Sequence, residues 1–219
     1  HTHVIMVGGS YSGVPESLTN ALKSWVRGGG VFIGTQQGAE WAVANGLADV
    51  SMMGVKRKGQ KDGDKPGKKG DDKGNDDEPP AVVAYADKRD FDRSERISGA
   101  IFEGVLDPTH PLGFGYDGSE IFVHKEGEKG FEPGKNPFGL VVRYAEDPLA
   151  SGYASATNEE RLAGKGMLAA ERVGAGSVIL FADNPNFRAY WMGTKRLFSN
   201  SLFFGTAFSR PASRPYSEE

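Results

Sequence analysis

The sequence predicts an α/β fold built on a parallel sheet, and three features indicate it. Two units of strand, glycine-rich turn and helix follow one another in residues 4–44. A third unit of strand, polar loop and helix occupies residues 174–205. Short apolar runs without polar alternation are typical of strands covered on both faces. Repeated strand–helix units favour parallel strands joined by right-handed crossovers.

The first two units are bounded by glycines and a proline. An apolar strand covers residues 4–7, and a helix opens at Pro15, because proline fits the first helical turn. Three glycines at 28–30 end that helix. Residues 31–33 form the second strand, and the turn at 34–38 leads into a second helix.

The middle of the chain predicts further strands with less regular connections. Residues 167–173 are expected to pair with 177–182 through the glycine turn at 174–176. A loop with two prolines and two glycines covers 107–116. The other expected elements are strands at 97–106, 121–123 and 140–144, a charged helix at 87–96 and a short helical turn at 158–162.

The third unit supplies the main candidate site. Its strand, residues 178–181, ends in turn residues, and an amphipathic helix is expected from Tyr190 onward. Ligands usually bind at the carboxyl ends of strands in open α/β sheets. The polar cluster after the strand is therefore the candidate binding site, with Asp183, Asn184, Asn186 and Arg188. Arg188 could hold a carboxylate; alternatively, a buried pair of Asp183 and Arg188 ties the loop to the helix start.

Composition narrows the classes of function. The 219 residues, 38% of them hydrophobic, suit one domain with one sizeable core. The net charge of -3 gives no reason to expect nucleic acid or an anionic membrane surface as a partner. The chain has no cysteine, which excludes a thiolate nucleophile. No run approaches the roughly 18 to 20 apolar residues of a membrane span, and the start at His1 suggests a piece of a longer protein.

Residues 56–80 form a low-complexity insertion. This stretch holds 8 basic and 7 acidic residues and five glycines among 25, without a large apolar side chain. Such a segment buries too little surface to offset its ordering entropy, so we expect a mobile surface loop. A basic nucleic-acid arm is the weaker alternative, because 8 minus 7 leaves a charge of only +1.

Two further positions, Gln36 and His110, are candidate catalytic or binding residues. The turn at 34–38 has the outline of a nucleophile elbow, but Gln36 stands at the nucleophile's place, and a carboxamide cannot attack an acyl carbon. Glycines that turn a strand tightly into a helix explain the same pattern. His110 in the loop 107–116 is either a loop-packing residue or a general base. The four histidines show no metal-binding spacing, so no metal or cofactor is expected in this chain.

Five stretches carry a resemblance to a known family: residues 99–102, 107–116, 151–153, 162–165 and 178–188. Together they resemble the C-terminal region of bacterial proteins of the zinc carboxypeptidase (carboxypeptidase A-like) family. That region is similar to a class I glutamine amidotransferase domain. The resemblance implies a flavodoxin-like α/β fold, that is, a doubly wound, mostly parallel sheet with helices on both faces. It implies one such domain at 1–208 and a tail at 209–219.

The resemblance also implies what this chain lacks. Active amidotransferases of this class use Cys, His and Glu, whereas this chain has Gln36 at the elbow and Asp183 and Asn184 after the late strand. The zinc ligands of the resembled peptidases, an H-x-x-E pair and a later histidine, are absent as well. Zinc is therefore expected only in the peptidase domain of a parent protein, and the family suggests a periplasmic or secreted location.

Three hypotheses follow. The leading one is a non-catalytic accessory domain of a zinc metallocarboxypeptidase-like protein, which acts in packing, substrate presentation or oligomerisation. Its partners would be the parent's peptidase domain and, in a homo-oligomer, a second copy of the chain. The second is a hydrolase with a site around His110, Asp183 and Arg188. The third is a small-ligand module that recognises a carboxylate or a sugar through Arg188 and nearby aromatic residues.

Overall fold

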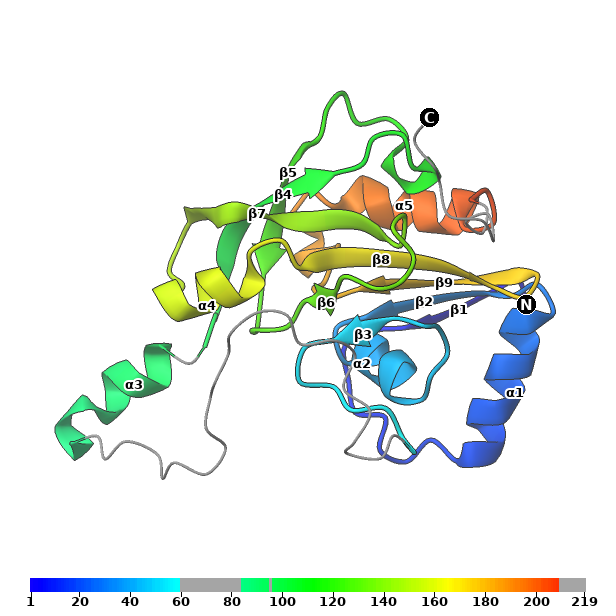
Figure 1. Ribbon diagram of the computed structural model, residues 1–219, viewed down its shortest axis with the longest axis horizontal. Helices are drawn as coiled ribbons and strands as arrows, with labels where there is room; N and C mark the ends of the chain where they lie inside the picture. The colour runs from blue at the N-terminus through cyan, green and yellow to red at the C-terminus, as the bar shows by residue number, and fades with distance from the viewer. Residues whose placement is uncertain (60–83, 95, 209–219) are drawn as a thin grey trace.

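The computed structural model describes residues 1–59, 84–94 and 96–208 (Figure 1). The expected tail at 209–219 and most of the expected insertion at 56–80 lie outside these residues. Within them, one sheet of nine strands forms the centre of the molecule, and its main path runs in the order β1-β2-β9-β8-β7-β4-β5.

One end of the sheet is parallel. The strands β1 (His3–Met6), β2 (Val31–Thr35) and β9 (Gly176–Phe181) pair in parallel, with Val31 opposite both His3 and Ser177. The first two helices, α1 (Glu16–Arg27) and α2 (Gln37–Ala44), pack on one face of these strands, and α5 (Lys195–Phe204) packs on the other (Figure 1). The three strand–turn–helix units predicted from the sequence therefore form this end of the fold.

The rest of the sheet is antiparallel. Along the main path, β8 (Gly166–Val173), β7 (Leu140–Ser151), β4 (Ala100–Leu106) and β5 (Glu120–Lys125) each run opposite to the strand before them. Two short strands, β3 (Ser51–Met52) and β6 (Phe131–Glu132), also pair in antiparallel fashion. The prediction of a flavodoxin-like, doubly wound and mostly parallel sheet is therefore wrong. The predicted packing of helices on both faces is found at the parallel end of the sheet.

The connections explain the difference. A parallel pair needs a crossover of a dozen or more residues, usually a helix, whereas an antiparallel pair is closed by a short turn. The strands β8 and β9 form the predicted hairpin, with Gly174 in the left-handed region at φ 68°. No described helix of more than one turn connects β4 to β5, and their connection holds only the short 3-10 helix η2 (Pro111–Gly113).

Alternate residues of the parallel strands enter two different cores. In β2, Val31 and Ile33 face the core under α5, while Phe32 faces the core under α1 and α2. The first core continues under the antiparallel strands, where Phe102 and Tyr144 meet edge to face at 5.8 Å between ring centroids. This period of two explains why an unbroken apolar run suits these strands.

The last helix begins later than predicted. The helix α5 starts at Lys195, and Tyr190 lies before it in a loop that contains the 3-10 helix η3 (Phe187–Ala189). Leu197 faces the core, as the helical pattern indicates, whereas Tyr190 is 63% exposed. The helical periodicity places Asn200 opposite the apolar face, but Asn200 is buried and donates to the carbonyls of Leu112 and Phe114, each at 2.8 Å.

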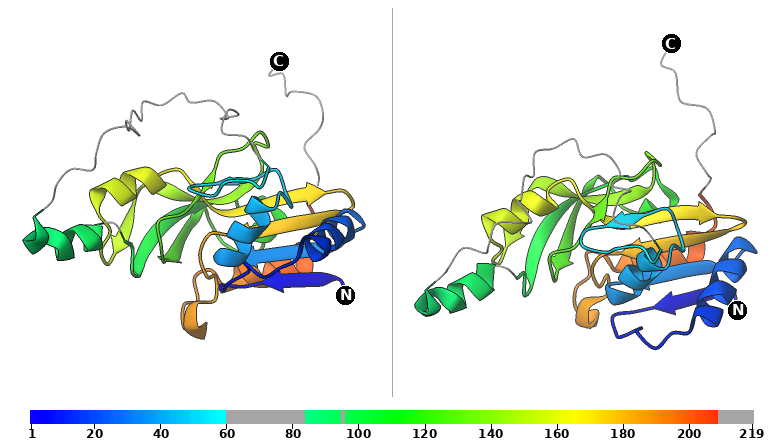
Figure 2. Two further views of the ribbon diagram at one scale, coloured as in Figure 1. Left: turned by 90° about the horizontal axis from the view of Figure 1, so that it is seen from below. Right: turned by 60° about the horizontal axis from the view of Figure 1, so that its bottom comes forward.

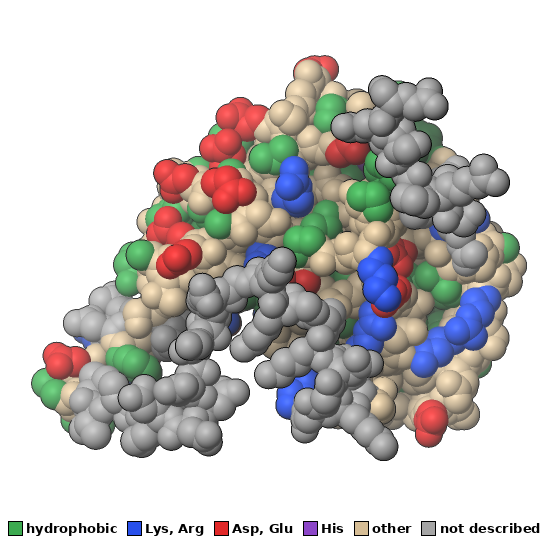
Figure 3. All heavy atoms as spheres, viewed as in Figure 1, with side chains coloured by type: hydrophobic (Ala, Val, Ile, Leu, Met, Phe, Trp, Pro, Cys, Tyr) green, Lys and Arg blue, Asp and Glu red, His purple; other side chains and the backbone are tan. Residues whose placement is uncertain are grey.

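Three further helical segments complete the described chain. The short α3 (Lys88–Ser94) follows the 3-10 helix η1 (Tyr85–Asp87), and α4 (Ala156–Leu162) connects β7 to β8. Figure 2 shows α4 and the loop with η3 projecting from different sides of the molecule. In the space-filling view, acidic side chains gather over α4 and β7 (Figure 3). No helix within the described residues is long and apolar enough to span a bilayer.

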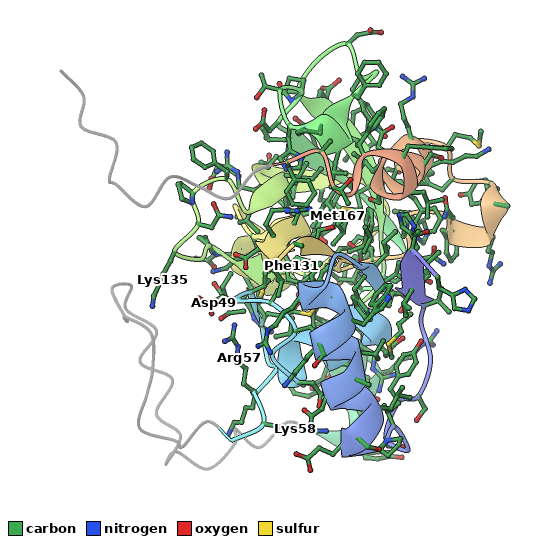
Figure 4. All side chains as sticks on the ribbon, turned by 90° about the vertical axis from the view of Figure 1, so that its right-hand side faces the viewer. Asp49, Arg57, Lys58, Phe131, Lys135 and Met167 are labelled. Atoms are coloured by element: carbon green, nitrogen blue, oxygen red, sulfur yellow. The ribbon has the colours of Figure 1, made fainter. Side chains whose placement is uncertain are left out.

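The start of the expected insertion is attached to the body of the protein. The guanidinium of Arg57 donates to the carbonyls of Ala48 and Val50 and forms an ion pair with Asp49 at 3.0 Å (Figure 4). The amide of Lys58 donates to the carbonyl of Ala44. Residues 57 and 58 are therefore part of the ordered structure, although the composition predicts a mobile loop from residue 56.

Candidate functional site

The turn between β2 and α2 has the shape of an elbow. Gln36 lies at φ 50° and ψ -121°, a backbone conformation that costs a non-glycine residue about 1–3 kcal/mol. The turn needs its glycine: a Cβ on Gly38 would lie 2.1 Å from the carbonyl oxygen of Met6. Gly8 also lies against this turn, since a Cβ there would lie 2.5 Å from the side-chain Oε1 of Gln36. The strand ends of β1 and β2 and the start of α2 therefore meet at Gln36.

Hydrogen bonds hold this elbow in place. The amide of Gln36 donates to the carbonyl of Phe181 at 3.0 Å, and its carbonyl accepts from Ala39 and Glu40. Its side-chain Nε2 donates to Oε2 of Glu126 at 3.4 Å. Gln36 thus contacts the ends of β9 and β5 as well as β1, and it is the residue on which the strand ends converge.

Beside the elbow, Asp183 is buried in a cluster of charged and polar side chains. Its Oδ1 accepts from Nζ of Lys125 at 3.0 Å and from the amide of Glu126 at 3.2 Å. Its Oδ2 accepts from the hydroxyl of Tyr144 at 2.5 Å. Lys125 also donates to the carbonyl of Lys129 at 2.8 Å. We call Asp183, Lys125 and Tyr144 the buried triad, because all three are at most 1% exposed.

The surroundings of the buried triad keep its tyrosine protonated. Burial, followed by the charge of Asp183 and its hydrogen bond, raises the pKa of Tyr144 well above the ordinary value of 10. The phenol is therefore a hydrogen-bond donor at neutral pH. The Lys125 ammonium also lies 5.2 Å from the centroid of the Tyr144 ring. With both oxygens of Asp183 occupied, the buried triad joins β5, β7 and the end of β9 and leaves no free base.

The partner of Asp183 differs from the one considered from the sequence. A buried pair with Arg188 was one alternative, but the partner is Lys125, which lies 58 positions away in the chain. The alternation along β5 carries a signal for this: Ile121, Val123 and Lys125 share one face, and all three are buried. A lysine that continues a buried face needs a carboxylate partner.

The other candidate residues of this loop shape it rather than contact Asp183. Asn184 Oδ1 accepts from the amide of Asn186 at 3.0 Å, which forms a local turn. Arg188 is exposed, with φ 49°, and its guanidinium lies 5.2 Å from the Phe187 ring centroid. The loop packs on the body through Phe187, which stacks on His124 with 3.8 Å between the centroids and 10° between the planes.

His110 lies at the far end of the sheet. Lys125, the partner of Asp183, pairs with Ala100 at the start of β4, whereas His110 follows the end of that seven-residue strand. Six steps of about 3.3 Å correspond to about 20 Å along the strand. The structure brings Gln36 and Asp183 together through Glu126 and does not bring His110 to them. A hydrolase that uses His110, Asp183 and Arg188 in one pocket is not supported by this arrangement.

His110 has a local role at its own position. Its Nδ1 accepts from the amide of Leu112 at 3.1 Å, and its ring lies 5.1 Å from that of Phe208. Burial lowers the pKa of His110 below 6.5, although Asp107 acts in the opposite direction. The neutral ring therefore caps the turn of η2, as the loop-packing interpretation of this histidine requires.

The described residues do not include a cluster of side chains suited to hold a metal ion. No group of three or more His, Cys, Asp or Glu side chains among these residues lies together in a way that could hold one. The candidate site is thus the convergence of Gln36, Glu126 and the buried triad at the strand ends. Its groups fix the strand ends to one another, and the elbow position itself holds the carboxamide of Gln36.

Comparisons with known proteins give similarities in structure alone. No protein-family model matches the chain, and no curated protein matches it. The chain is similar to the cytoplasmic protein STM3548 from Salmonella typhimurium, with 10% identity and a TM-score of 0.49 over 93% of this chain and 71% of that one. It is also similar to the β-galactosidase from Rahnella sp. R3, with 12% identity and a TM-score of 0.38 over 100% of this chain and 24% of that one.

A third similarity is to the β-galactosidase from Bacillus circulans sp. alkalophilus, with 10% identity and a TM-score of 0.36. It covers 94% of this chain and 21% of that enzyme. The chain therefore spans about a quarter or less of the length of either β-galactosidase. At these identities and TM-scores the similarities carry no argument about function, which must be argued from the residues of the chain.

Proposed function

We propose that this chain is a non-catalytic accessory domain of a zinc metallocarboxypeptidase-like protein, and that its partner is the peptidase domain. The observation that supports this most is Gln36. It has the strained backbone of an elbow between strand and helix, the place where an acyl-transfer enzyme needs a nucleophile. The side chain there is a carboxamide, which is no nucleophile at neutral pH.

The buried triad supports the same proposal. A catalytic carboxylate must reach a substrate or orient a base, and Asp183 is 1% exposed with both oxygens bonded to Lys125 and Tyr144 and the Glu126 amide. Paired in this way, it holds strands together. Two features typical of an enzyme site are present, an elbow at Gln36 and the carboxylate of Asp183 at the strand ends. Both are hydrogen-bonded to other parts of the protein.

The small-ligand module is the second candidate, and Arg188 favours it. Its guanidinium is exposed, and among the described residues it makes no ion pair. It would have to bind a carboxylate without Asp183, which lies buried with other partners. A thermal-shift screen of small carboxylates and sugars against the chain and its Arg188→Ala variant separates this candidate from the accessory domain.

The experiment that tests the proposal uses the complete protein that contains this chain. Zinc-dependent release of C-terminal residues from peptides is measured with the complete protein, with its Gln36→Ala variant and after deletion of residues 1–208. We expect the deletion to lower kcat/KM or the stability of the peptidase, while Gln36→Ala leaves kcat unchanged. Loss of kcat in Gln36→Ala, or a deletion without any effect, would contradict the proposal.

A further inference from the structure

A strip of aromatic side chains lies along the loop before α5 and the edge strand β5, between Arg188 in that loop and Arg196 near the start of α5. At one end, the Arg188 guanidinium lies 5.2 Å from the Phe187 ring centroid. Phe187 stacks on His124, and His124 lies 6.3 Å from Trp191 between centroids. These contacts link the loop to the outer edge of the sheet.

The strip continues to the second arginine. The indole of Trp191 donates to the carbonyl of Phe122 at 3.2 Å. The Tyr116 hydroxyl donates to the carbonyl of Gly193 at 2.8 Å, and the Arg196 guanidinium lies 5.7 Å from the centroid of the Tyr116 ring. We call this surface, from Arg188 to Arg196, the arginine strip.

The arginine strip has the composition of a protein interface. Aromatic residues, Met and Arg are enriched at such interfaces, and Asp and Glu are depleted. Tyr190 and Met192 on the strip are 63% and 62% exposed, and Phe122 is 39% exposed. On the side of the loop and α5, residues 184–208 contain no Asp or Glu, whereas the β5 side carries the exposed Asp117 and Glu120. Neither Arg188 nor Arg196 forms an ion pair with a described residue.

The same chain carries a surface of opposite charge. Acidic side chains gather over α4 and β7 (Figure 3), and we call Glu146, Asp147, Glu159 and Glu160 the acidic patch. Four acidic residues less Arg161 on α4 and Arg143 on β7, both exposed, leave a local charge of -2. Because α4 and the η3 loop project from different sides of the molecule (Figure 2), one copy can use both surfaces at once.

We propose that the arginine strip of one copy of this chain binds the acidic patch of a second copy. The charges are complementary, the strip supplies exposed aromatic area, and two arginines can each take a carboxylate in a bidentate pair. Since the two surfaces differ, the contact is heterologous and each added copy leaves one strip and one patch free. Association therefore continues beyond a dimer unless a ring closes. This inference goes beyond the accessory function, which does not depend on it.

Charge reversal of each surface tests the contact. Sedimentation velocity of the 23.5 kDa chain is measured over a range of protein concentrations at low and high salt. The strip is reversed by Arg188→Glu with Arg196→Glu, and the patch by Asp147→Lys with Glu160→Lys. We expect the wild-type chain to associate at low salt and less at high salt, and each reversed variant to have a Kd at least tenfold higher.

A mixture of the two reversed variants gives the decisive result. Each variant repels its own kind. In the mixture, the unmodified strip of the patch variant fits the unmodified patch of the strip variant, and the two reversed surfaces are complementary as well, so mixing restores association. Arg27→Glu with Lys135→Glu is the matched control, because both side chains are exposed away from these surfaces; it should associate as the wild type does. Arg188→Ala with Arg196→Ala replaces the strip variant if reversal impairs folding. A wild-type chain that stays at 23.5 kDa, reversed variants that associate normally, or a mixture that stays monomeric would each overturn the inference.

Discussion

The substitution Asp183→Leu should be among the most destabilising changes in this protein. It leaves the Lys125 ammonium, 0% exposed, with only the carbonyl of Lys129, and it leaves the Tyr144 hydroxyl without its acceptor. Removing one partner of a buried ion pair costs about 3–5 kcal/mol, because the remaining charge is buried without compensation. For a chain of this length, each kcal/mol lowers Tm by about 2–4 °C, so we expect a Tm roughly 6–20 °C lower.

Urea unfolding monitored by circular dichroism measures this loss. The triple variant Lys125→Met, Asp183→Leu, Tyr144→Phe removes every polar side chain of the buried triad, and it should recover at least half of the loss. Asp49→Leu is the control, because the Asp49–Arg57 pair is a surface contact with about 0–1 kcal/mol at stake. A loss below about 1 kcal/mol for Asp183→Leu, or a triple variant as unstable as the single one, would refute this reasoning.

Three further predictions concern the elbow and His110. Gln36→Gly relieves the strain at φ 50° and should raise the free energy of unfolding by up to about 1 kcal/mol, whereas Gln36→Val should lower it by at least as much; equal effects in urea unfolding would argue against strain. Gly38→Ala places a Cβ 2.1 Å from a carbonyl oxygen and should cost about 2 kcal/mol or more, while Gly13→Ala, with nothing within 4 Å, should cost less than half of that. In a proton NMR titration, His110 should have a pKa below 6.5, so its contribution to stability is lost as pH falls below about 6.5; a midpoint above 6.5 would contradict its burial.

The sequence predicts the parallel end of the sheet because each strand there is followed by its own helix. The apolar run in β9 and the glycine turns after β1 and β2 identify these units without knowledge of the tertiary structure. The direction of the other strands depends on whether a helix or a short connection joins them, and the periodicity within one strand carries no information on this. The hairpin of β8 and β9 was the local signal against a mostly parallel sheet, and it was correctly predicted.

The candidate site could be predicted only in part, for a similar reason. Asp183 can be identified from the sequence as a candidate site residue, because its carboxylate directly follows the apolar run of a buried strand. Its partners Lys125 and Tyr144 lie 58 and 39 positions away, and only the strand order brings them to the same place. Arg188 is close to Asp183 in sequence, but residues 188 and 189 have left-handed backbone conformations and the Arg188 side chain is exposed. The strain at Gln36 was predictable as a tight turn, since glycines flank it at 34 and 38.

The most direct test of the non-catalytic role is a hydrolysis assay on the purified chain. Release of ammonia from L-glutamine and release of C-terminal residues from peptides are measured with zinc supplied, for the wild-type chain and for Gln36→Ala. We expect both proteins to give the rate of the blank, because the elbow holds a carboxamide and Asp183 is occupied. Turnover by the wild-type chain that disappears in Gln36→Ala would show that the chain is itself an enzyme, and the accessory role would be wrong.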